Sequence, residues 1–281
     1  MPLSSPVLDA AHLAELNKRY LWHPFTQMQD YTRSEPLIIA RGEGMKLQDV
    51  QGRWYWDGVA SIWLNVHGHH VPELDAAIHE QLALVAHATL LGQANVPAIQ
   101  LAEKIIQRMP PGLTRVFYSD SGAEAVEIAL KMAFHYWRHR GQPQRQKFVR
   151  LDNAYHGDTI GAVSVGGMPL FHETYRALLF PSIGVPYPHP YRFAGTPAAC
   201  VAASLAALEE VLAREGDSIV GVIVEPIVQG AAGIIVAPPG WLTGVRRLCT
   251  QYGVLLLADE VATGFGRTGR LWACDHEGVV P

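Results

Sequence analysis

The chain has 281 residues, of which 49% are apolar and 17% charged, so it can form a large hydrophobic core and is not mainly disordered. Its 22 basic and 26 acidic side chains give a net charge of −4, which excludes the strongly basic surface typical of proteins that bind nucleic acid or anionic membranes. Three scattered cysteines and the lack of a long apolar stretch predict a reduced, cytoplasmic protein without signal peptide, membrane span or disulfide.

Short elements are predicted for the N-terminal third of the chain, where glycines interrupt brief apolar runs. A helix is expected around residues 9–19. Three short antiparallel strands should follow it at 37–40, 45–49 and 53–57. Two helices should come next, at 72–88 and 96–109.

Strands and helices alternate from residue 115 to residue 260, which is typical of a mainly parallel α/β sheet covered by helices on both faces. The clearest helix follows Ser121, where apolar residues recur at helical spacing. Residues 181–197, rich in proline and aromatics, are expected to form a loop. Apolar runs predict strands at 115–118, 147–151, 219–224 and 254–258, with further helices at 197–214 and 240–252.

The residues Ser121, Gly122 and Ala123 stand where the first of these strands runs into the clearest helix. Free backbone N–H groups at a helix start, next to small side chains, suit the binding of a phosphate group. An ordinary capped helix would give the same pattern, so this segment alone leaves both interpretations open.

Polar residues also follow other predicted strands, at the edge of the sheet where ligands bind in such folds. Tyr155 and His156 could stack on a flat ligand, or lie in a surface turn. Asp259 ends a buried strand, where an acid is costly unless it has a partner. It could hold a cationic ring nitrogen, or cap the following turn. Glu225 stands at a similar strand end and is a weaker indication.

Two further patterns are interpreted as structural. Residues 264–269 match the glycine pattern GxGxxG. A dinucleotide site requires a long helix directly after this pattern and an acid about 20 residues further on, and the sequence has neither. His67, His69 and His70 lack a spaced fourth ligand, so no metal site is expected.

Taken together, the phosphate turn, the aromatic residue and the strand-end aspartate resemble the cofactor site of fold-type I pyridoxal-phosphate enzymes. Longer strings narrow the resemblance to the class III aminotransferases, from about residue 20 to the end of the chain. These strings are WHPFT at 22–26, YSDSG at 118–122, YHGDT at 155–159, EPIVQG at 225–230 and DEVATGFGRTG at 259–269.

The resemblance implies a fold-type I transferase that binds pyridoxal 5′-phosphate. Residues 1–60 would be part of a small domain, and residues 61–281 a partial large domain. The backbone of Gly122 and Ala123, beside Ser121, would bind the cofactor phosphate.

The same resemblance implies roles for the other strand-end residues. Tyr155 would stack on the cofactor ring, with His156 beside it, and Asp259 would keep the ring nitrogen protonated. The substrate pocket would be lined by Phe25, Ile62, Trp63 and again Tyr155.

Within the class, WHPFT at 22–26 and ATGFGRTG at 262–269 are similar to the corresponding strings of an enzyme of biotin biosynthesis. The implied activity is transamination of a small molecule by a cytoplasmic homodimer. Some relatives have Tyr in place of Phe25 and a Trp pair in place of Ile62 and Trp63. These differences leave open whether S-adenosylmethionine or lysine is the amino donor. Another class III enzyme, acting on an ω-amino acid or a diamine, remains the alternative.

The Schiff-base lysine of the family follows the strand-end aspartate by a short stretch, but no lysine follows Asp259 in this sequence. We therefore expect the chain to be truncated before the C-terminal small domain and to be inactive as written. A catalytically dead fragment is a further alternative. Its lysines are Lys18, Lys46, Lys104, Lys131 and Lys147.

Overall fold

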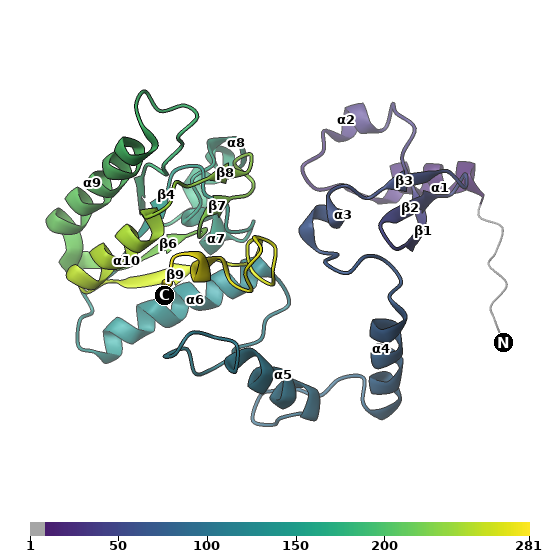
Figure 1. Cartoon of the computed structure of the whole chain (residues 1–281). Helices are drawn as coiled ribbons and strands as arrows, with labels where there is room; N and C mark the ends of the chain where they lie inside the picture. Colours follow the sequence, from purple (N-terminus) through teal and green to yellow (C-terminus); the bar gives the residue numbers. More distant parts are fainter. Residues whose placement is uncertain (1–8) are drawn as a thin grey trace. The chain divides into compact units, whose positions relative to one another are not determined.

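Figure 1 shows the computed structural model, which describes residues 9–281 and forms two compact units, residues 1–95 and 96–281. The predicted division at residue 60 falls inside the first unit and stays a prediction, because compactness alone does not identify a functional domain. The expected absence of a signal peptide concerns in part residues 1–8, which lie outside the described part.

The first unit is built from short elements, and its predicted antiparallel strands are confirmed. They form one sheet in which the second strand is central. The elements are α1 (Ala10–Tyr20), α2 (Met28–Tyr31), β1 (Ile39–Glu43), β2 (Lys46–Asp49), β3 (Trp54–Trp56), α3 (Ala60–Trp63) and α4 (Pro72–Leu84).

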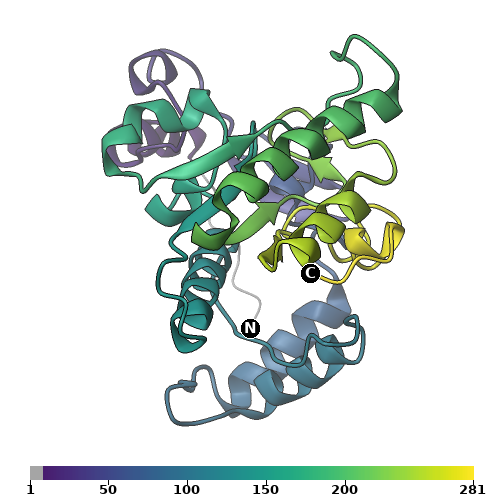
Figure 2. The ribbon, with the colours of Figure 1, turned by 90° about the vertical axis from the view of Figure 1, so that its left-hand side faces the viewer.

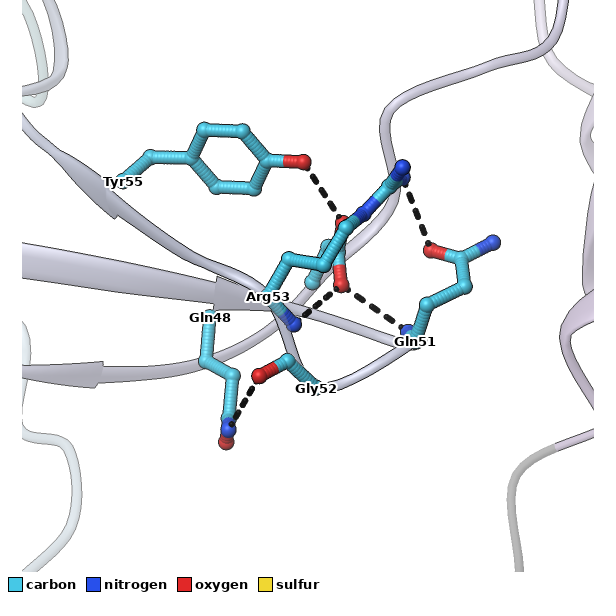
Figure 3. A network of polar contacts seen from close by, with 6 residues as sticks. Gln48, Gln51, Gly52, Arg53 and Tyr55 are labelled. Atoms are coloured by element: carbon cyan, nitrogen blue, oxygen red, sulfur yellow. Dashed lines mark hydrogen bonds and ion pairs between the residues drawn. The ribbon is translucent and has the colours of Figure 1, made fainter.

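The buried carboxylate of Asp49 closes the turn between β2 and β3. Its Oδ1 accepts the N–H groups of Gln51 and Arg53, both at 2.9 Å. Its Oδ2 accepts Arg53 Nε at 2.7 Å and the Tyr55 hydroxyl at 2.8 Å. Figure 3 shows Gln51, Arg53 and Tyr55 gathered around this turn. Burial raises the pKa of Asp49, but the hydrogen bonds from Arg53 and Tyr55 outweigh it and lower the pKa to about 2.

Asp49 should therefore make the first unit sensitive to acid. Its pKa is lowered in the folded chain, so its stabilising effect is complete above the ordinary value of 3.8 and is lost as the pH falls towards about 2. A ¹³C NMR titration of the carboxyl should give a midpoint near 2. Tyr55→Phe removes one donor and should raise that midpoint. A midpoint near 3.8 in the unsubstituted chain would contradict the network.

The second unit contains a four-stranded sheet in the order β5–β4–β6–β9, in which all neighbours are parallel. The predicted parallel α/β sheet is confirmed. Its strands are β4 (Lys147–Leu151), β5 (Ser182–Val185), β6 (Ile219–Val224) and β9 (Leu255–Ala258), and a small hairpin joins β7 (Val228–Gln229) and β8 (Ile235–Val236).

Helices cover both faces of this sheet. Helix α6 lies on one face, and α9 and α10 lie side by side on the other (Figure 2). The helices of the unit are α5 (Val96–Ile106), α6 (Gly122–His139), α7 (Ile160–Ser164), α8 (Pro169–His172), α9 (Pro197–Glu215) and α10 (Trp241–Gln251), with 3-10 turns η1 (Glu173–Leu178), η2 (Gly216–Ser218) and η3 (Ala273–His276).

The two faces bury different side chains of the same strands. In β6, Val220 and Ile223 pack towards α6, whereas Val222 and Val224 pack towards α9 and α10. A strand that is buried on both faces has to be apolar along its whole length, which explains the continuous apolar run of β6.

Two predictions for this unit are wrong. Residues 115–118 form no strand, because no neighbouring segment among residues 9–281 pairs with them. Ser182–Val185, expected in a loop, is the edge strand β5 and pairs with β4. Pro181 and Pro186 flank it, and an edge strand tolerates such neighbours because one side of its backbone needs no partner.

Trp137 fastens α6 to the sheet and should be a main contributor to the stability of this unit. Its buried indole Nε1 donates to the Val220 carbonyl at 2.7 Å. Trp137→Phe should lower the free energy of unfolding by about 2 kcal/mol, because it removes a buried hydrogen bond and opens a small cavity. Tyr136→Phe, at an exposed ring on the same helix, should change it by less than about 0.5 kcal/mol in urea unfolding. Equal losses would contradict this role of Trp137.

Candidate functional site

The parallel strands β4, β6 and β9 end side by side, so the residues that follow them meet at one edge of the sheet. Val224 lies opposite Ala258 in the register. The N–H group of Asp259 continues the ladder by donating to the Val224 carbonyl at 2.8 Å. The structure therefore brings the segment of Tyr155 and His156 next to that of Asp259, although the two segments lie far apart in the sequence.

A buried pair of Asp259 and His156 forms the centre of this edge. Asp259 Oδ2 lies 2.7 Å from His156 Nδ1, and the side chains are 7% and 0% exposed. The other oxygen of Asp259 accepts the N–H group of Val261 at 3.0 Å. A buried carboxylate needs such partners, and the short contact requires the hydrogen of Nδ1 to point at Asp259. His156 Nε2 is buried and has no hydrogen-bond partner within residues 9–281.

The start of α6 lies against both of the loops that carry this pair. A Cβ atom on Gly122 would lie 2.9 Å from the side chain of Val261, and one on Gly157 would lie 2.5 Å from Ala123 Cβ. Ser121 caps the helix by accepting the Glu124 N–H at 3.2 Å. The N–H groups of Gly122 and Ala123 have no partner in the described part of the chain. They are therefore available to an anion at the positive end of α6.

Tyr155 is held at both ends. Its N–H group donates to Glu225 Oε1 at 3.1 Å, and its hydroxyl donates to Asp158 Oδ2 at 2.8 Å. Its ring meets Phe171 edge to face, with 6.3 Å between the ring centres. Burial and the bond to Asp158 raise the pKa of the hydroxyl, which therefore stays protonated at neutral pH.

Sequence reasoning missed one member of this cluster, Asp158, and gave another, Glu225, less weight than its contacts in the structure support. Asp158, the acceptor of the Tyr155 hydroxyl, stands three residues further along the same string, but that spacing is common in turns and indicates nothing alone. Glu225 carries the signal of an acid after a buried strand, as Asp259 does, but its partners come from distant loops and are visible only in the structure.

The predicted substrate residues Phe25, Ile62 and Trp63 all belong to the first unit, so their contact with substrates stays a prediction. The element α3, which carries Ile62 and Trp63, is a left-handed turn, in which all four residues have φ between 49° and 68°. Asp57 holds this turn by accepting the backbone N–H and the hydroxyl of Ser61, both at 2.9 Å. Such backbone is costly for residues other than glycine and is typical of functional segments.

Two of the three histidines, His69 and His70, bond to acidic side chains. His69 Nε2 bonds to Asp57 and His70 Nδ1 bonds to Asp75. No group of three or more metal-ligating side chains is found in residues 9–281. Residues 264–269 form turns that lead into the short η3. None of the helices in the described part is long and apolar enough to cross a membrane.

Comparison with known proteins identifies the family. Residues 28–281 match the family model of class III aminotransferases. The chain belongs to the class III aminotransferase family. The resemblance predicted from the sequence strings is thereby confirmed.

Curated class III relatives named adenosylmethionine-8-amino-7-oxononanoate aminotransferase match almost the whole chain. The protein of Geobacter sulfurreducens is 49% identical over 279 residues, which cover 98% of this chain and 62% of the relative. The protein of Anoxybacillus flavithermus is 55% identical over 268 residues, which cover 95% and 59%. The chain thus spans about 60% of the length of these relatives.

Solved structures of class III transaminases have the same fold. The aminotransferase of the same name from Methanocaldococcus jannaschii is 44% identical, with a TM-score of 0.88 over 95% of this chain and 58% of that chain. An (S)-enantioselective omega-transaminase from Thermomicrobium roseum is 38% identical, with a TM-score of 0.93 over 98% and 62%.

Gly157 should be essential for the contact between the His156 loop and α6. Gly157→Ala places a Cβ atom at a φ of 116° and against Ala123. Gly112→Ala is the matched control, since Gly112 has a φ of 107° but no atom within 4 Å of an added Cβ. The control should lose about 1 kcal/mol of unfolding free energy through its φ alone. Gly157→Ala should lose about 2 kcal/mol more, by urea unfolding. Losses of the same size would contradict the close packing.

Proposed function

We propose that this protein takes part in biotin biosynthesis by transaminating 8-amino-7-oxononanoate to 7,8-diaminononanoate with pyridoxal 5′-phosphate. The observation that carries the proposal is the buried His156–Asp259 pair at the start of α6, in a chain about 50% identical to relatives named for this reaction. The family resemblance assigns the pair to the ring nitrogen of the cofactor.

The residues present fit such a cofactor. The N–H groups of Gly122 and Ala123 are oriented by α6 and would bind the phosphate, next to Ser121. The Asp259 carboxylate is held by His156 and would hold a proton on the ring nitrogen. Tyr155, fixed by its hydroxyl and N–H bonds, would stack on the ring. When bound, pyridoxal phosphate acts as an electron sink during loss of a substrate proton. An omega transaminase from Pseudomonas jessenii, 32% identical, was solved in complex with PMP.

The substrates are small molecules, and Phe25, Ile62 and Trp63 are proposed to contact them together with Tyr155. The amino donor is S-adenosylmethionine or lysine. A second candidate is an omega-transaminase activity, which the 38% identity and TM-score of 0.93 to the Thermomicrobium roseum enzyme favour.

We also propose that the protein works as a homodimer in the cytoplasm. The support for a dimer is the strongly exposed apolar side chains of the first unit, among them Trp22 and Trp56. Sedimentation of the protein that carries this chain tests the proposal, and an active monomer would contradict it.

Cofactor binding by the chain should depend on Asp259. Pyridoxal phosphate should bind with a shifted absorbance maximum, and Asp259→Asn should weaken binding by about 10- to 100-fold, because a hydrogen bond to a charged group is worth about 1.5–3 kcal/mol. Asp217→Asn, at an exposed aspartate, should bind as the unsubstituted chain does.

The reaction itself is tested by genetic complementation. The complete gene should restore growth without biotin to a strain that lacks this aminotransferase, and its Asp259→Asn variant should not. Growth that fails with the complete gene, while the purified protein transaminates ω-amino acids or diamines, would favour the second candidate.

A further inference from the structure

Glu225 is a buried carboxylate at the site to which the proposed reaction assigns no role. It stands directly after β6, and the residue is only 5% exposed. Its Oε1 accepts the N–H group of Tyr155 at 3.1 Å, and its Oε2 accepts the N–H group of Gly230 at 2.9 Å. One carboxylate therefore joins the loop after β4 to the loop after β7.

The segment between Glu225 and Gly230 has a backbone that needs such support. Ile227 has a φ of 68°, which a β-branched side chain rarely adopts. The turn around it is closed by the Val228 N–H, which donates to the Pro226 carbonyl at 2.8 Å. A backbone of this kind persists only where its surroundings hold it.

A second side chain ties the same segment to the end of β4. Gln229 is fully buried, and its Nε2 donates to the Asp152 carbonyl at 3.0 Å. The segment 225–230 is thus fastened to the β4 loop at two points, and Glu225 provides the one that reaches the main chain of Tyr155.

We propose that Glu225 is a positioning residue that fixes Tyr155 relative to the His156–Asp259 pair. The inference rests on the proposed function, which assigns Tyr155 to the cofactor ring. Tyr155 directly precedes His156, so a bond to its N–H group fixes the main chain from which both side chains project.

Only a carboxylate satisfies both N–H groups. A carboxylate has two acceptor oxygens, whereas a glutamine of the same shape has one oxygen and an NH₂ group. In Glu225→Gln, the NH₂ group of the glutamine would face one of the two backbone N–H groups, so that two donors would meet and no hydrogen bond would form. Burial raises the pKa of Glu225 above its ordinary value, and Asp259 adds to this, although the Gly230 and Tyr155 N–H groups and His156 act to lower it. The two N–H groups therefore offset part of the cost of burying the carboxylate.

The chain contains a matched control in Glu277. Its carboxylate also accepts two backbone N–H groups, those of Gly240 at 2.8 Å and Thr243 at 2.7 Å. It holds the start of α10 and bonds to no residue of the proposed cofactor site. Glu277→Gln makes the same chemical change at a place that leaves Tyr155 untouched.

Amide hydrogen exchange of the 281-residue chain tests whether Glu225 holds the Tyr155 and Gly230 N–H groups, and it needs no cofactor. The Tyr155 and Gly230 amides should be protected, although Tyr155 and Gly230 lie outside helices and strands. Glu225→Gln should speed their exchange at least tenfold and leave the Gly240 and Thr243 amides unchanged, and Glu277→Gln should do the reverse. Exchange of Tyr155 that is no faster in Glu225→Gln would overturn the proposal. If that variant does not fold, unprotected Tyr155 and Gly230 amides in the unsubstituted chain would overturn it.

The circular dichroism of bound pyridoxal phosphate tests the effect on the site. At saturating cofactor, Glu225→Gln should lose at least half of this signal and Glu277→Gln should retain it, even if both lower the unfolding midpoint equally. Equal signals in the two variants would overturn the positioning role. If the unsubstituted chain gives no cofactor signal, the predicted binding of pyridoxal phosphate to this chain fails, and hydrogen exchange still decides whether Glu225 holds Tyr155.

Discussion

Buried carboxylates at the ends of parallel strands constrain this structure more than any other feature. A charge taken out of water destabilises the fold unless donors surround it, and Glu225, Asp259 and Glu260 all follow strands buried in the sheet. Asp259 meets the His156 ring, Glu225 meets two N–H groups, and Glu260 meets the start of η3. Because these donors come from different segments, the need to satisfy each acid draws the loops after β4, β6 and β9 together.

The same edge is shaped by residues that have little or no side chain. Gly122 and Gly157 allow the start of α6 to touch the loops of Asp259 and His156, and Ala123 fills the remaining space. The far end of α6 is anchored by Trp137, whose indole bonds to β6. The apolar stripe of the helix thus determines where its N-terminal N–H groups lie, and packing in the core is linked directly to the placement of an anion site.

The two units are stabilised by different interactions. Apart from Pro36, the buried apolar side chains of the described residues belong to the second unit, beginning with Val126. The first unit relies on polar networks, in which Asp49 closes the β2–β3 turn and Asp57 holds the left-handed turn of α3. The strained turn carries Ile62 and Trp63, which are proposed to contact the substrates. A segment held by hydrogen bonds and not by core packing can change its side chains without repacking a core.

The sequence alone determined the family, the parallel sheet with its covering helices, and three of the segments that meet at the site. Apolar runs and helical spacing are local patterns, and the strand-end residues Tyr155, His156 and Asp259 stand directly behind them. The tertiary structure decided what depends on partners distant in the chain. Ser182–Val185 is a strand because β4 lies beside it, whereas residues 115–118 form no strand because no described segment pairs with them. Glu225 is held by N–H groups of residues that lie 70 positions before it and 5 positions after it in the sequence. A hydrogen bond between distant parts of the fold produces no repeating pattern in the sequence, because it depends on a single residue at each end.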